Sequence, residues 1–194
     1  LYEGDMISID GGLGEVYIGE LESEPSKLSD EFHTLMEWCD KFRRLTIRAN
    51  AETIIDTEKS LEFGADGIGL CRTEHMFFEG ERIIPMREMI MSDTKQGRER
   101  ALSKLITYQI SDFEALFLLL KDKPITVRLL DPPMHEFLPK SDIEMTDLGD
   151  AIGVSPAHIR EMLLKLSESN PMLGHRGVRL GLSYPEIYEM QVEA

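Results

Sequence analysis

The sequence predicts an α/β protein built as the first half of a (β/α)8 barrel and preceded by a short β-hairpin. From Leu45 onward, four short and mostly apolar segments with strand character alternate with segments of helical spacing. Eight such units close a barrel, so four units correspond to half of one. A doubly wound open sheet is the structural alternative, but no Gly-x-Gly-x-x-Gly motif follows a strand, and no Walker A sequence occurs.

The hairpin is expected within residues 1–22. Residues 6–9 and 15–18 are β-prone and flank the turn-forming run Asp10-Gly11-Gly12-Leu13-Gly14, whose glycines allow positive φ angles. The acidic, serine-containing segment 20–29 predicts a linker with a domain boundary near residue 22. We therefore expect three parts: a hairpin at 1–22, a linker and connecting helix at 23–44, and the half-barrel at 45–194.

The remaining elements follow from hydrophobic spacing and from capping residues. Strands are expected over 45–49, 66–71, 124–130 and 173–180, and helices over 30–43, 53–63, 86–121, 155–167 and 184–194. Gly64 is placed to end the second of these helices. Ser111-x-x-Glu114 is a capping box that predicts a break in the long helix, and Ser183-x-x-Glu186 predicts the start of the last one.

Composition excludes several classes of protein. The chain has 194 residues and a formal net charge of −15, so most of its surface would repel nucleic acid and anionic membranes. The longest apolar run, Ala115–Leu120, is too short to span a bilayer. Two cysteines, Cys39 and Cys71, suggest a reducing compartment, and we expect a cytoplasmic protein, with an organelle as the alternative. Because Leu1 opens the chain without a methionine, we expect a piece of a longer protein.

No metal site is expected in this chain. The five histidines never occur at metal-ligand spacing, and two separated cysteines do not form a zinc motif. Glu52, Asp56 and Glu58 lie near the first expected strand, where a solvated helix face explains them better than a metal does.

Arginines stand at the ends of three expected strands. Arg72 follows the uncharged run Ile68–Cys71 and is itself followed by Thr73, Glu74 and His75. The carboxyl ends of parallel strands meet at one face of a barrel, so Arg72 is expected to project into its mouth. A guanidinium matches phosphate or carboxylate oxygens with two parallel hydrogen bonds, although an ordinary solvated strand end is an equally simple explanation.

Arg128 is the second candidate, because it lies between Val127 and Leu129 in an otherwise apolar segment. A charge there needs an acidic partner or a ligand. Asp131 could be a purely structural partner, and that alternative remains open at this point. The two prolines that follow Asp131 direct the chain out of the strand.

Arg176 and Arg179 are three residues apart, so on a strand they would face opposite sides. We favour Arg176 for the site, because Gly174 and Gly177 allow close backbone approach, and we expect Arg179 to form a structural ion pair. His75, His135 and His175 flank the arginines, but loop histidines with ordinary hydrogen bonds are the simpler interpretation. Arg72, Arg128 and Arg176 together predict a converging anion site.

These segments resemble the phosphoenolpyruvate-binding barrel of the pyruvate, phosphate dikinase family. The matching stretches are Leu45–Ala51, Gly64–Phe78, Thr126–Pro139 and Asn170–Gln191, and Gly4–Gly19 resembles the last hairpin of the family's swivelling phosphohistidine domain. Two related families, phosphoenolpyruvate synthase and Enzyme I of the sugar phosphotransferase system, share the barrel. They are not expected to carry Arg-Leu-Leu-Asp-Pro-Pro followed by His-Glu-Phe-Leu-Pro, as this chain does.

The resemblance implies a reaction that interconverts ATP, pyruvate and phosphate with AMP, phosphoenolpyruvate and diphosphate through a phosphohistidine. It implies that Arg72 and Arg128 bind the phosphate and carboxylate of the substrate, with Arg176 as a third cation. It also implies Mg²⁺ and a homodimer in the intact enzyme.

The chain also departs from the family pattern. The Gly-Gly-x-Thr-Ser-His type motif of the phosphohistidine and the ATP site do not occur in it. By resemblance, the magnesium ligands and the proton-donating cysteine belong to later strands, and Cys71 is not that cysteine. We therefore expect the isolated chain to be inactive. The alternatives are a fragment of one of the two sister enzymes, or a non-catalytic anion-binding module.

Overall fold

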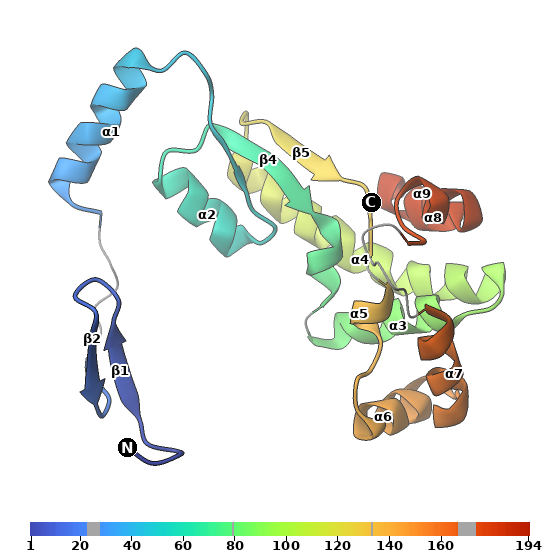
Figure 1. Ribbon diagram of the computed structural model, residues 1–194. Coiled ribbons are helices and arrows are strands. Elements are labelled where there is room, and N and C mark those ends of the chain that lie inside the picture. The colour runs from blue at the N-terminus through green and yellow to red at the C-terminus, as the bar shows by residue number, and fades with distance from the viewer. Residues whose placement is uncertain (23–27, 79, 133, 167–173) are drawn as a thin grey trace. The chain divides into compact units, whose positions relative to one another are not determined.

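The computed structural model describes residues 1–22, 28–78, 80–132, 134–166 and 174–194, without the side chain of His135 (Figure 1). The chain divides into two compact units, Leu1–Arg44 and Leu45–Ala194. Most of the expected linker falls on residues 23–27, outside the described residues. No helix in the described ranges combines the length and the hydrophobicity that crossing a membrane requires.

The first unit contains the expected hairpin and helix. Strands β1 (Ile7–Asp10) and β2 (Glu15–Ile18) pair antiparallel. The Asp10 carboxylate accepts hydrogen bonds from the backbone N–H groups of Gly12 and Leu13 at 2.8 and 2.9 Å, which stabilises the turn. Helix α1 (Asp30–Phe42) begins at Ser29, whose hydroxyl accepts from the backbone N–H of Phe32.

The second unit contains a three-stranded parallel sheet, in the order β3 (Arg48–Asn50), β4 (Gly67–Arg72) and β5 (Ile125–Arg128). Strand β3 begins three residues later than expected. The reason is a local exchange of hydrogen bonds, in which the Ile47 N–H donates to the Asp66 carboxylate and the Asp66 N–H donates to the Ile47 carbonyl, both at 2.8 Å. The Ile47 N–H is therefore bound by a side chain instead of a neighbouring backbone, and the regular pairing with β4 begins only at Arg48.

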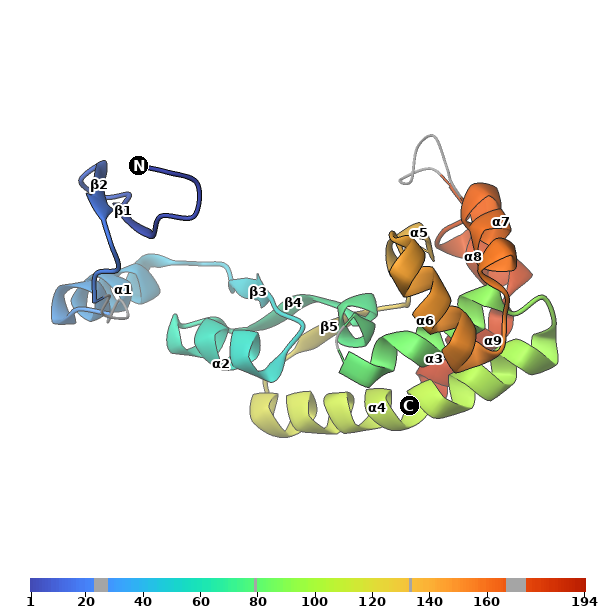
Figure 2. The same ribbon diagram turned by 90° about the horizontal axis from the view of Figure 1, so that it is seen from below.

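Two helices, α2 (Ile54–Glu62) and α4 (Lys95–Leu120), pack against one face of this sheet (Figure 2). The core there consists of Ile68 and Cys71 from β4 and Phe113, Leu116 and Leu120 from α4, with Ala49, Ile125 and Val127 against it. Because side chains alternate along a strand, Asn50, Thr126 and Arg128 belong to the opposite face.

The long expected helix is interrupted, but not at Ser111. Helix α3 (Ile83–Met91) ends before Thr94, whose hydroxyl accepts from the Gly97 N–H at 3.1 Å and starts α4. The predicted break at Ser111 is wrong, because the buried face of α4 continues through that point from Leu105 over Gln109 to Phe113. Packing of this face outweighs the local capping signal.

A second core lies among the helices. It joins α3 and α4 to α5 (Met134–Phe137), α6 (Asp142–Ile152), α7 (Pro156–Leu166), α8 (Val178–Ser183) and α9 (Pro185–Glu193). Sequence reasoning missed α6, although Ser141 caps its start and Gly153, at φ +73°, ends it. Short 3₁₀ turns at Thr73–Phe77 and Gly80–Arg82 follow β4.

The fourth expected strand is wrong in the part that the structure describes. Leu173 lies outside the described residues, residues 174–177 form a loop, and 178–183 form α8. Gly177 has a φ of +54°, which interrupts an extended chain, and Leu180 is fully buried in the helical core. The capping box at Ser183 is also wrong, because Glu186 instead forms a buried ion pair with Arg98 at 2.5 Å.

Candidate functional site

Arg72 and Arg128 lie side by side at the ends of neighbouring strands. They are register partners in the parallel pair β4 and β5, and each is the last residue of its strand. Neighbouring strands are roughly 4.8 Å apart, and paired residues of a parallel sheet project from the same face. The structure therefore brings these two predicted site residues together, at the carboxyl edge of the sheet.

Each of the two guanidiniums is held by a carboxylate. Arg72 Nη1 donates to Glu52 Oε1 at 2.8 Å, and Arg128 Nη2 forms an ion pair with Glu74. The side chains of Arg72 and Arg128 are 34% and 33% exposed, whereas those of Glu52 and Glu74 are only 14% and 3% exposed. The acids therefore hold the guanidiniums from the buried side, while about a third of each arginine side chain stays exposed.

The partner of Arg128 was not identified from the sequence. Asp131 was the candidate, but the structure pairs Arg128 with Glu74, 54 residues earlier in the chain. The second carboxylate oxygen of Glu74 and the Nε of Arg128 are buried and have no hydrogen-bond partner among the described residues. Glu74 lies two residues after Arg72 in the sequence, but nothing in its local sequence indicates that its side chain is buried.

Arg176 is bound by Asp131 instead. Arg176 Nε and Nη2 donate to the two Asp131 carboxylate oxygens at 3.0 and 2.9 Å, and Nη2 also donates to the Asp131 carbonyl. Gly177 N–H adds a bond to the same carboxylate at 3.1 Å. Arg176 thus lies against the residue three positions after Arg128, with its planar fork already occupied by a carboxylate.

Arg179 and the flanking histidines have local roles. Arg179 Nε donates to the Gly174 carbonyl at 2.8 Å. His175 Nε2 lies 2.9 Å from the Ser183 hydroxyl, and the His75 ring makes an edge contact with Phe78. The His135 side chain is outside the described residues.

Cys71 precedes Arg72 and is fully buried. Burial, together with the negative charges of Glu52 and Asp112, raises the pKa of this thiol to about 11. A neutral buried thiol is a poor proton carrier or nucleophile near pH 7. Cys71 is therefore a core residue rather than a reactive group.

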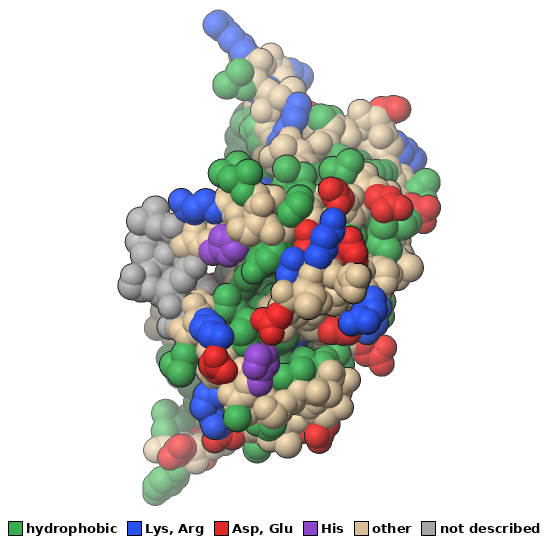
Figure 3. Space-filling model, turned by 90° about the vertical axis from the view of Figure 1, so that its right-hand side faces the viewer, with side chains coloured by type: hydrophobic (Ala, Val, Ile, Leu, Met, Phe, Trp, Pro, Cys, Tyr) green, Lys and Arg blue, Asp and Glu red, His purple; other side chains and the backbone are tan. Residues whose placement is uncertain are grey.

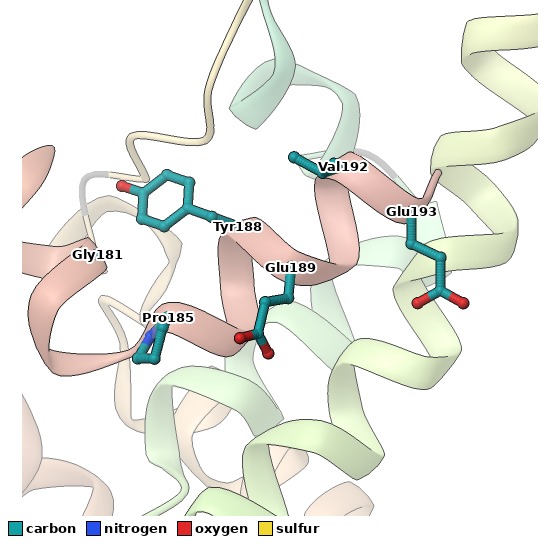
Figure 4. Close-up of a pocket in the computed structure, with 6 residues that line it drawn as sticks. All are labelled: Gly181, Pro185, Tyr188, Glu189, Val192 and Glu193. Carbon is teal, nitrogen blue, oxygen red and sulfur yellow. The ribbon is translucent and has the colours of Figure 1, made fainter.

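Two hollows of the second unit have the size of a small-molecule site. One, of about 720 Å³, opens beside Glu52 and His75 and reaches the Arg82–Asp112 ion pair, but none of the three predicted arginines lines it. The other, of about 580 Å³, lies on α8 and α9 around Tyr188 and Val192 (Figure 4). Among the described residues that line it, the charged ones are Glu189 and Glu193, which would repel an anion.

The charged groups place limits on other ligands. Among the described residues, no three His, Cys, Asp or Glu side chains come together as a metal-binding group. On the face drawn in Figure 3, basic and acidic side chains are interspersed rather than gathered into one basic patch. That face offers no extended surface for nucleic acid.

The chain is similar to known proteins over its whole length. The model of the PEP-binding domain of PEP-utilising enzymes matches residues 26–194. The chain therefore belongs to the family of PEP-utilising enzymes, as its arginine-bearing strand ends suggested. It is 52% identical over 194 residues to the pyruvate, phosphate dikinase of Rhizobium meliloti, and 48% and 50% identical over 192 residues to those of Clostridium symbiosum and Giardia intestinalis. It spans 22% of the length of each of these relatives and 99–100% of its own length is matched.

Proposed function

We propose that this chain supplies the substrate-binding arginines of an enzyme that interconverts ATP, pyruvate and phosphate with AMP, phosphoenolpyruvate and diphosphate through a phosphohistidine. The identities to pyruvate, phosphate dikinases support this assignment over the two sister enzymes. The observation that carries it is the pairing of Arg72 with Arg128 at the ends of β4 and β5. Because the two residues end neighbouring strands, one small molecule with two acidic groups can contact both side chains.

The role of the arginines follows from their charge and shape. Phosphoenolpyruvate carries a phosphate and a carboxylate, and each presents a pair of oxygens that a guanidinium can bind with two hydrogen bonds. Arg72 and Arg128 bind these groups through their exposed edges, while Glu52 and Glu74 keep them oriented. Arg176 is the third cation, and it contributes once its fork is shared between Asp131 and the substrate.

The same cations assist phosphoryl transfer. During transfer, negative charge is spread over the equatorial oxygens of the phosphoryl group, and fixed positive charges stabilise that distribution. Because the guanidiniums are already oriented, little reorganisation is needed when the charge develops. Magnesium, when bound in the intact enzyme, would neutralise further phosphoryl charge, and its ligands are assigned to residues outside this chain.

The chain is proposed to contain parts of two domains of the intact enzyme. Residues 1–22 are assigned to the end of a phosphohistidine domain, and residues 45–194 to the first half of the substrate-binding barrel. By itself, the chain is expected to bind phosphoenolpyruvate without converting it. The intact enzyme is proposed to be a cytoplasmic homodimer.

Calorimetric titration with phosphoenolpyruvate tests the proposal. Wild-type chain should bind saturably, and Arg72→Ala and Arg128→Ala should each weaken binding at least about tenfold, since a charged hydrogen bond contributes about 1.5–3 kcal/mol. Arg100→Ala is the matched control, because Arg100 is exposed on α4 and its loss changes the net charge equally. Binding that is equally strong in all four proteins would contradict the proposal.

A further inference from the structure

The side chain of Gln191 joins the two strand ends that carry Arg72 and Arg128. It comes from α9, is 5% exposed, and was not identified as a functional residue from the sequence. Gln191 Nε2 donates to the Thr73 hydroxyl at 3.0 Å and to the Arg128 carbonyl at 3.1 Å. Its Oε1 accepts from the Leu130 N–H at 2.6 Å. Both the nitrogen and the oxygen of the Gln191 side-chain amide are therefore hydrogen-bonded. The partners are Arg128 itself, Leu130 two residues later, and Thr73, which follows Arg72.

The hydrogen bonds of Gln191 with β5 and the residues after it have the pattern that a neighbouring parallel strand would make. In a parallel sheet, one residue pairs with its neighbour strand by donating its N–H to one carbonyl and accepting from the N–H two residues further on. Gln191 makes this pair of bonds with the Arg128 carbonyl and the Leu130 N–H, using a side-chain amide in place of a peptide group. The regular pairing between β4 and β5 ends at Arg72 and Arg128, and the Gln191 side-chain amide provides the next hydrogen bonds beyond that pair.

Thr73 completes the link to β4. Its hydroxyl, which is fully buried, donates to the Arg128 carbonyl at 3.1 Å while it accepts from Gln191. The Arg128 carbonyl thus receives one hydrogen bond from the residue after Arg72 and another from α9. These bonds fix the distance between the two backbones at the point where both guanidiniums leave the sheet.

We propose that Gln191, acting with Thr73, is a positioning residue for the substrate arginines: it holds the ends of β4 and β5 at the separation that lets Arg72 and Arg128 bind one anion. This inference rests on the proposed function. The role is distinct from general packing of α9, which depends on apolar residues such as Ile187 and Met190 in the helical core.

Four variants of the chain test the role. Gln191→Met keeps the size of the side chain and removes its hydrogen bonds, and Thr73→Val removes the hydroxyl. Each should weaken phosphoenolpyruvate binding about tenfold, as loss of one or two buried hydrogen bonds predicts. Thr73→Ser keeps the hydroxyl and should bind as wild type. Met190→Ala loosens the α9 packing but removes none of the hydrogen bonds of Gln191, and should lower the melting temperature but leave the affinity unchanged.

Hydrogen exchange provides a second readout that general destabilisation would not reproduce. In Gln191→Met, the amide of Leu130 should lose protection, whereas the amide of Ile68, which donates to the Pro124 carbonyl at 2.9 Å, should keep it. Wild-type affinity in Gln191→Met, or equal losses in Gln191→Met and Met190→Ala, would overturn the positioning role alone. Absence of binding by the wild-type chain, or wild-type binding by both arginine variants, would overturn the proposed function and this role with it.

Discussion

Glu74 is buried, and its carboxylate forms an ion pair with the guanidinium of Arg128. The two partners are not equally exposed, because Arg128 keeps a third of its side chain open while Glu74 keeps only 3%. Removal of Arg128 and removal of Glu74 should therefore lower the free energy of unfolding by different amounts. A buried carboxylate without a cation is much less favourable than a partly hydrated guanidinium without an acid.

Arg128→Met should consequently destabilise the chain more than Glu74→Leu does. We expect a loss of about 3 kcal/mol for Arg128→Met, because Glu74 is left uncompensated, and the double variant should recover most of that loss. Urea unfolding, followed by circular dichroism, measures the free energies of unfolding of the two single variants and of the double variant. A larger loss for Glu74→Leu than for Arg128→Met would contradict the burial assigned to these residues.

Cys71 should be chemically silent in the folded chain. Its pKa is raised from 9.0 to about 11, so its thiol stays neutral at pH 7–8, whereas Cys39 is exposed. A thiol reagent at pH 8 should modify one cysteine per folded chain and two in urea, and Cys39→Ser should abolish the native reaction. Fast modification of two cysteines in folded protein would contradict the buried position of Cys71.

The raised pKa of Cys71 also makes the stability of the fold depend on pH. Because the folded-state pKa of Cys71 lies above its ordinary value, the neutral thiol stabilises the fold fully below about pH 9, and this contribution is lost as the pH rises toward about 11. Cys71→Ala should therefore show a smaller fall in melting temperature between pH 8 and pH 10.5 than wild type. An identical fall in both proteins would show that other groups cause it.

Gln109 lies in the middle of α4 and is fully buried, yet neither its amide nitrogen nor its carbonyl oxygen has a hydrogen-bond partner among the described residues. Gln109→Met has a similar size and removes this unpaired amide, so it should raise the free energy of unfolding by about 1 kcal/mol. Gln96→Met, at an exposed position of the same helix, is the control. A loss of stability in Gln109→Met alone would mean that the amide is hydrogen-bonded in solution.

The isolated chain should self-associate as its concentration rises. Large apolar side chains are exposed in both units, among them Ile9 and Ile18 on the hairpin and Val178, Leu182 and Val192 on α8 and α9, each at least 71% exposed. Exposed apolar surface of this kind favours association. Sedimentation velocity at increasing concentration tests this, and a monodisperse monomer at every concentration would contradict it.

The parts of the fold that follow from short-range signals were predicted well. The hairpin, α1, α2, β4 and β5 occur close to their expected bounds, because turn glycines, caps and uncharged apolar runs specify them locally. The adjacency of Arg72 and Arg128 follows from the same reasoning, since consecutive parallel strands usually pair and end at one edge.

The errors have a different physical origin. Residues 178–183 have strand-like composition but form a helix, because Leu180 packs into a core that is assembled from distant helices. Likewise, Asp131 is near Arg128 in sequence, yet Arg128 pairs with Glu74 and Asp131 with Arg176, because the fold rather than the local sequence selects ion-pair partners. Gln191 was missed for the same reason, as its partners lie 61 to 118 residues away.

The central claim is that the guanidiniums of Arg72 and Arg128 contact one and the same anion. Nuclear magnetic resonance of the arginine Nε–H groups during titration with phosphoenolpyruvate tests it most directly, with Arg72→Lys and Arg128→Lys used to assign the signals. We predict that the signals of Arg72 and Arg128 shift together with a single dissociation constant, while that of Arg100 does not move. A shift of only one of the two signals, or two different dissociation constants, would contradict the shared site.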